Sequence, residues 1–321
     1  MSDTKQLLVV HSSPHFHSSR STSNVMLDVI IALIPALAVS VWLFGPRALI
    51  VTLICASVCV VAEYITRRIL KRDNAIGDLS AVVTGLLLGF NLPPSIPFWM
   101  AGVGALVAIV VVKQMFGGLG FNFVNPALIG RIALIVSFPK EMSAFTAPFA
   151  WHGSADAVTS ATPLGILNEG SGEALPSLAD LFLGRHGGSL GETCALALLI
   201  GGIYLVVRRV ISPVIPLCYI CTTVFITTLF GQNPLVQLLS GGLILGAVFM
   251  ATDYVTSPVT FSGKIIFAFG CGVLTAVIRL WGSMPEGVSF SIIIMNILVP
   301  YIERATQPVP FGVKREKEKR K

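Results

Sequence analysis

Long apolar runs separated by short polar stretches form the main pattern along this chain. Ten of the runs approach the roughly 20 residues that an α-helix needs to cross the hydrocarbon core of a bilayer. We therefore expect an all-α, polytopic membrane protein with about ten transmembrane helices. The expected spans are 25–44, 47–66, 79–92, 96–113, 122–138, 191–207, 214–230, 237–252, 263–281 and 287–302.

Two of these runs, 79–92 and 237–252, are short and rich in glycine, and each ends at a polar residue with proline close behind. The sequences are GLLLGFNLPP and GAVFMATDYVTSP. Helices of this kind are interrupted at membrane depth in many transport proteins, where freed carbonyls coordinate ions. Asn91 and Asp253 end the two runs and are candidates for an ion path. The alternative is that they cap the interrupted helices.

The chain divides into two halves of about five spans each around a polar segment. An odd number of spans in each half inserts the halves in opposite orientations, which is the inverted-repeat arrangement. We expect five regions. They are an N-terminal segment 1–24, a first five-helix repeat 25–138, a loop 139–190, a second five-helix repeat 191–303 and a basic tail 304–321.

Composition supports a membrane location. The chain is 54% hydrophobic and 12% charged, and its mean hydropathy is +0.82, which exceeds what a soluble domain of this size can bury. The net charge of +6 does not indicate a nucleic-acid partner, because the basic residues flank apolar runs or lie in the tail. With both termini in the cytoplasm, only Arg47, Lys140 and Arg185 lie outside, which satisfies the positive-inside rule and places 139–187 on the outer side.

Six cysteines all lie in apolar runs, and Cys218 and Cys221 form a CxxC pair. No second pair and no nearby histidine completes a ligand set, so we interpret them as small apolar side chains and expect no metal. Three carboxylates lie near inner span ends. Asp28 and Glu63 are expected to pair with basic residues such as Arg67, and Asp78 to cap the third span.

The outward loop contains DAVTSATPLG, which runs from Asp156 to Gly165. Its small residues leave the Thr162 hydroxyl accessible, and Pro163 favours an extended backbone at Thr162. Asp156, Thr159 and Ser160 carry oxygens that suit a metal or a phosphate. On composition alone, an ordinary Ser/Thr-rich loop remains the alternative.

This stretch resembles the motif at which a flavin transferase joins FMN to a hydroxyl through a phosphoester. Asp156, Thr159, Ala161 and Thr162 match that motif, while Ala157 and Ser160 stand where glycine is usual. Segments along nearly the whole chain resemble the D-subunit family of Rnf ion-translocating oxidoreductases, which is related to the B-subunit family of the sodium-pumping NADH:quinone reductase. They are SSPHFHSSRSTSNVMLDVIIALIPA, GDLSAVVTGLLLGFNLPP, GGLGFNFVNPALIGRIALIVSFP, GETCALALLIGGIYLVVRRVIS, GAVFMATDYVTSPVT and GVLTAVIRLWGSMPEGVSFSIIIMNILVPYI.

The resemblance implies a protein that works as part of a complex and is not catalytic alone. It implies a role in electron transfer between ferredoxin and NAD coupled to sodium-ion or proton translocation across a bacterial or archaeal cytoplasmic membrane. Covalent FMN on Thr162 follows, with a flavin transferase for maturation and room for a noncovalent riboflavin. The implied partners are other Rnf subunits, including a second FMN-carrying subunit and iron–sulfur subunits. The implied fold is similar to that of urea and ammonium transporters.

Two points stay open. Arg131 in NPALIGRIALIV is expected either to neutralise a flavin phosphate or pyrimidine oxygen or to pair with a carboxylate. The same scaffold without redox chemistry would be a passive channel, or a scaffold protein whose flavin site is vestigial. A flavinylation motif between the halves favours the redox role.

Overall fold

The computed structural model describes residues 21–152, 160–169, 175–282 and 287–308, and over these ranges it contains helices and no β-strand. The prediction of an all-α fold is confirmed. Four of the described helices are long and apolar enough to cross a membrane: α1 (Thr22–Phe44), α2 (Pro46–Ile69), α13 (Phe261–Trp281) and α14 (Val288–Thr306). Shorter apolar helices correspond to other expected spans: α3 (Ser80–Phe90), α4 (Phe98–Leu106) continued by the π-helical η2 (Val107–Gln114), α5 (Pro126–Ser137), α9 (Ala195–Val207) and α10 (Val214–Leu229).

Side-chain caps set several of the helix ends. The Asn125 side chain accepts hydrogen bonds from the backbone N–H groups of Ala127 and Leu128, and Pro126 occupies the first turn of α5. Between α1 and α2, Gly45 has φ of +78°, and a Cβ there would lie 2.7 Å from the Trp151 ring. Only glycine allows both the turn and this packing.

Both runs that we expected to be interrupted are short in the structure. In the first half, α3 ends at Phe90, where the chain turns at Asn91. In the second half, the corresponding run is divided into α11 (Pro234–Leu239) and a second helix, in which α12 (Leu243–Leu245) is continued by the π-helical η4 (Gly246–Met250). Such breaks expose backbone groups that helices otherwise satisfy internally, and the protein must supply partners for them.

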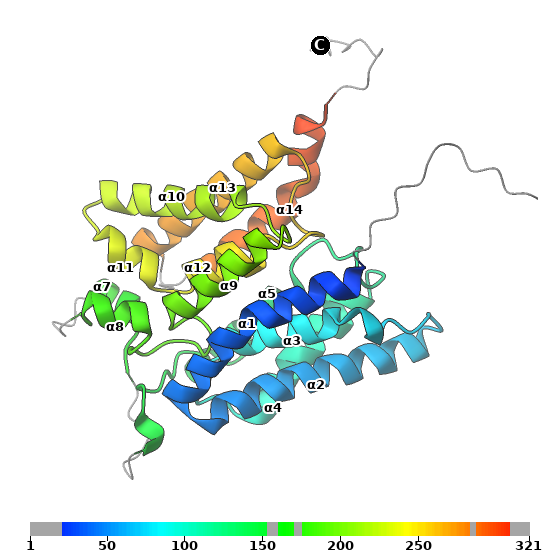
Figure 1. Ribbon diagram of the computed structural model, residues 1–321, viewed down its shortest axis with the longest axis horizontal. Helices are drawn as coiled ribbons and strands as arrows, with labels where there is room; N and C mark the ends of the chain where they lie inside the picture. The colour runs from blue at the N-terminus through cyan, green and yellow to red at the C-terminus, as the bar shows by residue number, and fades with distance from the viewer. Residues whose placement is uncertain (1–20, 153–159, 170–174, 283–286, 309–321) are drawn as a thin grey trace, which may run out of the picture.

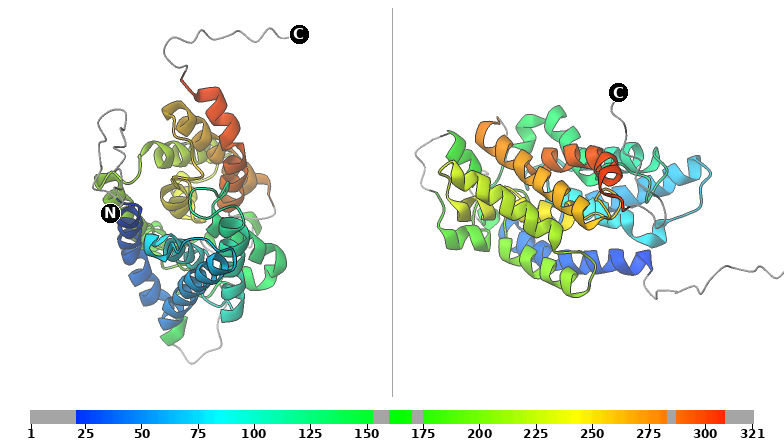
Figure 2. Two further views of the ribbon diagram at one scale, coloured as in Figure 1. Left: turned by 90° about the vertical axis from the view of Figure 1, so that its right-hand side faces the viewer. Right: turned by 90° about the horizontal axis from the view of Figure 1, so that it is seen from above.

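The two halves pack side by side. In Figure 1 the blue and cyan helices of the first half lie below the yellow, orange and red helices of the second half. α1 packs against α9, and α5 packs against α14, so helices that open and close the two halves meet at their boundary. Figure 2 shows the same contact between α1 and α9 from above. The start of α1 and the end of α14 lie toward one end of the molecule, away from α7 (Pro163–Glu169) and α8 (Leu178–Leu183).

The segment before α9 enters the protein instead of staying at its surface. The backbone N–H groups of Leu190 and Gly191 donate to the carbonyls of Leu92 and Phe90, at 3.0 and 2.9 Å. A Cβ on Gly191 would lie 2.3 Å from the Phe90 Cβ, which explains the glycine. The last part of the loop between the halves therefore satisfies carbonyls that the end of α3 leaves free.

Candidate functional site

Thr162 lies at the start of α7 and is partly exposed. Its Oγ1 accepts a hydrogen bond from the Gly165 backbone N–H at 3.1 Å. Within the described residues, the Thr162 hydroxyl accepts this hydrogen bond and donates none. Ala161 is exposed beside it, which keeps the approach to Oγ1 open. Two other motif residues, Asp156 and Thr159, lie outside the described ranges.

Contacts on both sides of Thr162 fix its position. The Ser160 N–H donates to the Phe145 carbonyl at 2.9 Å, and the Ser160 side chain lies against Gly187, where a Cβ would be 2.6 Å from Oγ. Leu164 is buried against Gly241, where a Cβ would be 2.3 Å from its Cδ1. Thr162 is thus held between the segment that precedes α9 and the turn that follows α11.

Six buried polar residues lie next to these two contacts, and we call them the outer cluster: His186, Ser189, Glu192, Gln237, Ser240 and Arg279. Arg279 of α13 donates from Nη1 to the Gln237 carbonyl at 2.6 Å and from Nη2 to the Ser240 carbonyl at 2.8 Å. Glu192 Oε1 accepts from the Ser189 N–H at 3.3 Å. Arg279 Nη2 and Glu192 Oε2 lie against the adjacent glycines Gly241 and Gly242, yet no carboxylate in the described ranges lies within ion-pair distance of Arg279.

The outer cluster is incompletely hydrogen-bonded. Five of its buried side-chain atoms have no hydrogen-bond partner within the described part of the chain: His186 Nε2, Ser189 Oγ, Glu192 Oε2, Ser240 Oγ and Arg279 Nε. Buried polar groups in native proteins are nearly always paired, because an unpaired one costs about 1–3 kcal/mol. Such a concentration of unpaired atoms beside Thr162 indicates a position that a polar ligand or water completes.

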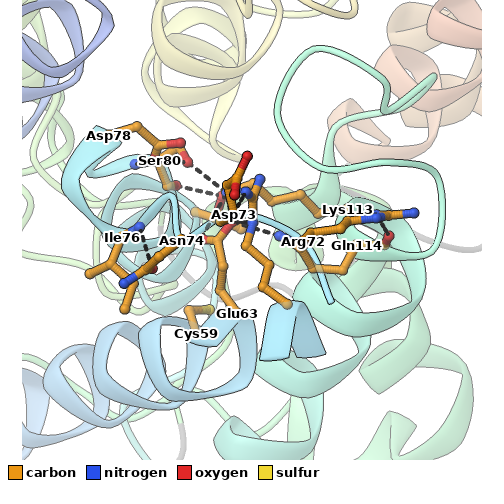
Figure 3. Close-up of polar contacts among 12 residues, drawn as sticks. Cys59, Glu63, Arg72, Asp73, Asn74, Ile76, Asp78, Ser80, Lys113 and Gln114 are labelled. Carbon is orange, nitrogen blue, oxygen red and sulfur yellow. Dashed lines mark hydrogen bonds and ion pairs between the residues drawn. The ribbon is translucent and has the colours of Figure 1, made fainter. Parts of the chain in front are cut away.

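A second polar group, the inner cluster, joins the ends of three elements of the first half: Glu63 of α2, Asp78 and Ser80 before and in α3, and Lys113 and Gln114 of η2 (Figure 3). Lys113 Nζ lies 3.0 Å from Glu63 Oε1 and donates to Ser80 Oγ at 2.6 Å. Gln114 Nε2 donates to Glu63 at 2.6 Å, and Asp78 Oδ1 accepts from the Ser80 N–H at 2.8 Å.

These contacts refine the reading of the inner carboxylates. Arg67 does lie near Glu63, with 3.7 Å between Nε and Oε1, but the shorter contact is the one to Lys113. Both Glu63 and Lys113 are fully or almost fully buried. Asp28 pairs with Arg208 at 3.3 Å and accepts from the Tyr204 hydroxyl at 2.9 Å, which links α1 to α9.

Beside the inner cluster lies a cleft between the two halves. Apolar side chains make up most of its lining, and α1, α3 and η4 supply seven of them. Its polar lining consists of Ser80, Thr84, Lys113, Asn122, Asn125, Thr252 and Asp253. Asp253, the predicted ion-path residue, accepts from the Thr256 hydroxyl at 3.2 Å and so closes a local turn as well as lining the cleft.

Asn91 and Arg131 meet in the middle of the protein. Arg131 Nη1 donates to Asn91 Oδ1 at 2.9 Å and to Ser289 Oγ at 3.1 Å. Asn91 Nδ2 donates to the Leu87 carbonyl at 2.7 Å, within the last turn of α3. This places a fixed positive charge against the Asn91 oxygen, which disfavours a cation there. The ion-path role of Asn91 and the flavin role of Arg131 stay predictions.

Sequence reasoning does not single out Lys113 or Glu192, although both are central to the two clusters. By pattern, Lys113 is one of many cytoplasmic charges, and Glu192 falls at the start of an expected span. The only feature of the sequence that could have pointed to Lys113 and Glu192 is that each is a charged residue directly at the end of an expected span. The six cysteines are free, and Cys221 is exposed on its helix. No group of three or more metal-binding side chains occurs in the ranges that the structure describes.

Comparison with known proteins places these features in context. The model of the NQR2, RnfD, RnfE family matches residues 9–312. The chain is 48% identical to the D subunit of the Na(+)-translocating ferredoxin:NAD(+) oxidoreductase complex of Acetobacterium woodii, over 98% of both chains. It is 43% identical to the D subunit of the proton-translocating ferredoxin:NAD(+) oxidoreductase complex of Clostridium ljungdahlii, over 97% of this chain and 98% of the relative. The D subunit of the ion-translocating oxidoreductase complex of Stutzerimonas stutzeri is 39% identical over 91% of this chain and 92% of that protein.

Proposed function

Because the chain belongs to the NQR2, RnfD, RnfE family, we propose that it is the D subunit of an Rnf-type complex. In that complex, electron transfer between ferredoxin and NAD is coupled to translocation of sodium ions or protons. The observation that carries the proposal is the 48% identity, over 98% of both chains, to the D subunit of the Na(+)-translocating ferredoxin:NAD(+) oxidoreductase complex of Acetobacterium woodii. The chain acts with other subunits, including a second FMN-carrying subunit and iron–sulfur subunits, and does not catalyse the reaction alone.

Thr162 is the attachment site that we propose for covalent FMN, joined by a flavin transferase through the phosphate. Three observations on the residues support the fit. The hydroxyl is partly exposed and donates no hydrogen bond within the described residues, its neighbour Ala161 is small, and unpaired buried polar atoms lie beside it. When bound, the flavin supplies the electron-carrying chemistry. The protein holds the attachment point rigidly through the Ser160 and Leu164 contacts.

The cleft beside the inner cluster is our candidate for a noncovalent flavin such as riboflavin. Mixed apolar walls and a few polar groups are the usual lining of small-molecule sites. Thr84, Asn122, Thr252 and Asp253 are among the polar side chains on this lining. To test for a noncovalent flavin, the purified full chain is dialysed and then denatured, and the flavin that denaturation releases is identified by chromatography. Riboflavin bound to Thr162→Ala protein is expected, and its absence from that variant would refute the assignment.

The proposed topology places both termini on the cytoplasmic side of a bacterial or archaeal cytoplasmic membrane, with Thr162 outside. The start of α1 and the end of α14 at one end of the molecule support it, as does the distribution of basic residues. Inverted repeats are supported by the pairing of α1 with α9 and of α5 with α14. Labelling from outside should reach Ser143→Cys and not Asp73→Cys; the reverse pattern would overturn the topology.

Covalent attachment is tested by co-expressing the full chain with a flavin transferase and recording in-gel flavin fluorescence. The tryptic or chymotryptic peptide containing Thr162 should gain the mass of FMN less one water, because the new phosphoester replaces the hydroxyl hydrogen of Thr162. Thr162→Ala should abolish both signals, and the control variant Ser143→Ala, at an exposed serine outside the motif, should retain them. An unmodified wild-type peptide would refute the flavoprotein assignment and favour the passive-channel alternative, whereas fluorescence that persists in Thr162→Ala would refute the site.

A further inference from the structure

We infer that the outer cluster docks the pyrimidine edge of the flavin that Thr162 carries. This inference rests on the proposed covalent FMN, and it assigns a role to side chains outside the attachment motif. The starting observation is the set of five buried atoms without partners within the described ranges. Glu192 is 94% buried, since its exposed fraction is 6%, and its Oε2 is one of them.

The attachment point lies directly beside these atoms. Ser160, two residues before Thr162, packs on Gly187, which adjoins His186. Leu164, two residues after it, packs on Gly241. The same glycine lies against Arg279, because a Cβ on Gly241 would be 2.9 Å from Nη2. A group tethered to Thr162 Oγ1 therefore starts between the two polypeptide segments that carry four of the unpaired atoms, and Arg279 of α13 carries the fifth.

The unpaired atoms include both donors and acceptors, and this mixture restricts the ligand. Arg279 Nε–H can only donate, and Glu192 Oε2 as a carboxylate can only accept. His186 Nδ1 lies 3.0 Å from the Gly187 carbonyl, so in the neutral ring Nδ1–H donates and Nε2 is left as an acceptor. Ser189 and Ser240 hydroxyls can do either.

A bare cation binds only to acceptors and is repelled by Arg279, so it does not fit the unpaired atoms of the outer cluster. A phosphate needs only donors and is repelled by Glu192. The pyrimidine edge of a flavin presents an N–H donor between two carbonyl acceptors, and it can engage donors and acceptors together. Water and the flavin edge both combine donors with acceptors, and of these two the flavin edge is the one that is tethered beside these atoms, at Thr162.

Backbone packing holds Glu192 in place for this role. A Cβ on Gly242 would lie 2.7 Å from Glu192 Oε2, and a Cβ on Gly188 would lie 3.3 Å from Oε1. The carboxylate is thus confined between two glycines. A fixed negative charge next to the ring disfavours additional negative charge on the reduced flavin, and the Arg279 guanidinium favours it. The balance of these two charges sets the reduction potential of the docked flavin.

Ring mobility tests the inference on the full chain co-expressed with a flavin transferase, and the signal of any noncovalent flavin is subtracted as measured in Thr162→Ala. Fluorescence anisotropy of the covalent flavin and its quenching by iodide are the readouts, with Thr162→Ala as the blank. We expect high anisotropy and weak quenching in the wild type. We expect lower anisotropy and severalfold stronger quenching in Glu192→Gln, together with a shift of the midpoint potential to more positive values.

Glu141→Gln is the matched control, because it removes the same charge from the same side of the membrane away from the outer cluster. It should leave all three readouts unchanged. Peptide mass spectrometry confirms equal FMN occupancy on Thr162 in each variant. A freely rotating, readily quenched flavin in the wild type, or a Glu192→Gln variant identical to the wild type, would overturn the inference while leaving covalent attachment intact. A wild-type chain with no FMN at Thr162 would instead refute the proposed function.

Discussion

The inner and outer clusters each contain a buried cation near the end of a fourth span, and they balance its charge differently. Lys113 contacts the Glu63 carboxylate at 3.0 Å, and Gln114 and Ser80 complete the arrangement. Arg279 instead contacts neutral carbonyls, with Glu192 nearby but not within ion-pair distance. Among the described residues, one side-chain atom of the inner cluster lacks a hydrogen-bond partner, Gln114 Oε1, against five in the outer cluster.

From this difference we infer a structural role for the inner cluster and a ligand-binding role for the outer cluster. A buried network with almost all of its atoms paired stabilises one arrangement of helices and has little capacity left for a ligand. An incomplete network of the same size is costly unless something else completes it. The inner cluster therefore fixes the ends of α2, α3 and η2 beside the cleft, and the outer cluster is where a bound group gains the most hydrogen bonds.

The largest expected effect comes from breaking the inner ion pair. Glu63→Gln leaves the Lys113 ammonium buried without its counter-charge, which should destabilise the flavin-free chain by about 3–5 kcal/mol. Reversible unfolding of the detergent-solubilised full chain measures this. The double variant Glu63→Gln/Lys113→Met removes both charges and should recover most of the loss. A double variant as unstable as the single one would mean that packing, not charge pairing, maintains the inner cluster.

A strained glycine provides the next test. Gly242 has φ of +65°, and a Cβ there would meet Glu192 Oε2 at 2.7 Å. Gly242→Ala should therefore cost about 1–2 kcal/mol from the left-handed backbone alone and should also displace the carboxylate. Gly77→Ala is the control, since a Cβ there meets nothing within 4 Å. Equal stabilities for the two variants, measured by unfolding in detergent, would contradict the close packing around Glu192.

The same Glu-to-Gln change should be much milder in the outer cluster. Without flavin, Glu192→Gln breaks no ion pair at contact distance, so we expect a loss of about 1 kcal/mol or less. Comparison with Glu63→Gln under identical unfolding conditions gives the contrast between the clusters in one experiment. Similar losses for both carboxylates would remove the distinction drawn between them.

Two serines give the smallest and most closely matched comparison. Ser80 Oγ accepts from Lys113 and lies in the completed network, so Ser80→Ala should cost about 0.5–1.5 kcal/mol. Ser189 Oγ has no hydrogen-bond partner in the described ranges, and Ser189→Ala should stay within about 0.5 kcal/mol of the flavin-free wild type. With FMN attached, the loss on Ser189→Ala should grow. A larger loss for Ser189 than for Ser80 without flavin would contradict the assignment of partners.

The sequence was most informative about the ends of the membrane spans, which the thickness of the bilayer constrains. The expected span 263–281 corresponds to α13 over 261–281, and 214–230 to α10 over 214–229, because apolar runs bounded by polar residues have one place to end in lipid. The run 237–252 was expected to be short, but the break between α11 and the continuous α12–η4 helix was not located by the sequence. That division depends on partners from other elements, such as Arg279, that hydropathy does not report.

The polar clusters were harder to predict. Glu63 and Lys113 are 50 positions apart, and the nearer Arg67 offered an equally plausible partner by spacing alone. Glu192 belongs to a segment that folds into the protein against the end of α3. The periodicity of hydrophobic positions does not predict such a segment. Thr162 could be predicted from the sequence because it lies in a recognisable motif. The residues of the outer cluster share no motif, and only the fold brings them together.

The central claim is that a flavin on Thr162 completes the outer cluster. The most direct measurement is an electron cryo-microscopy map of the complex containing this chain with FMN attached. We predict ring density with its pyrimidine edge within hydrogen-bond distance of Glu192 Oε2 and Arg279 Nε. Density for a ring attached to Thr162 but lying elsewhere, for example in the apolar cleft between Phe44 and Trp151, would contradict the account.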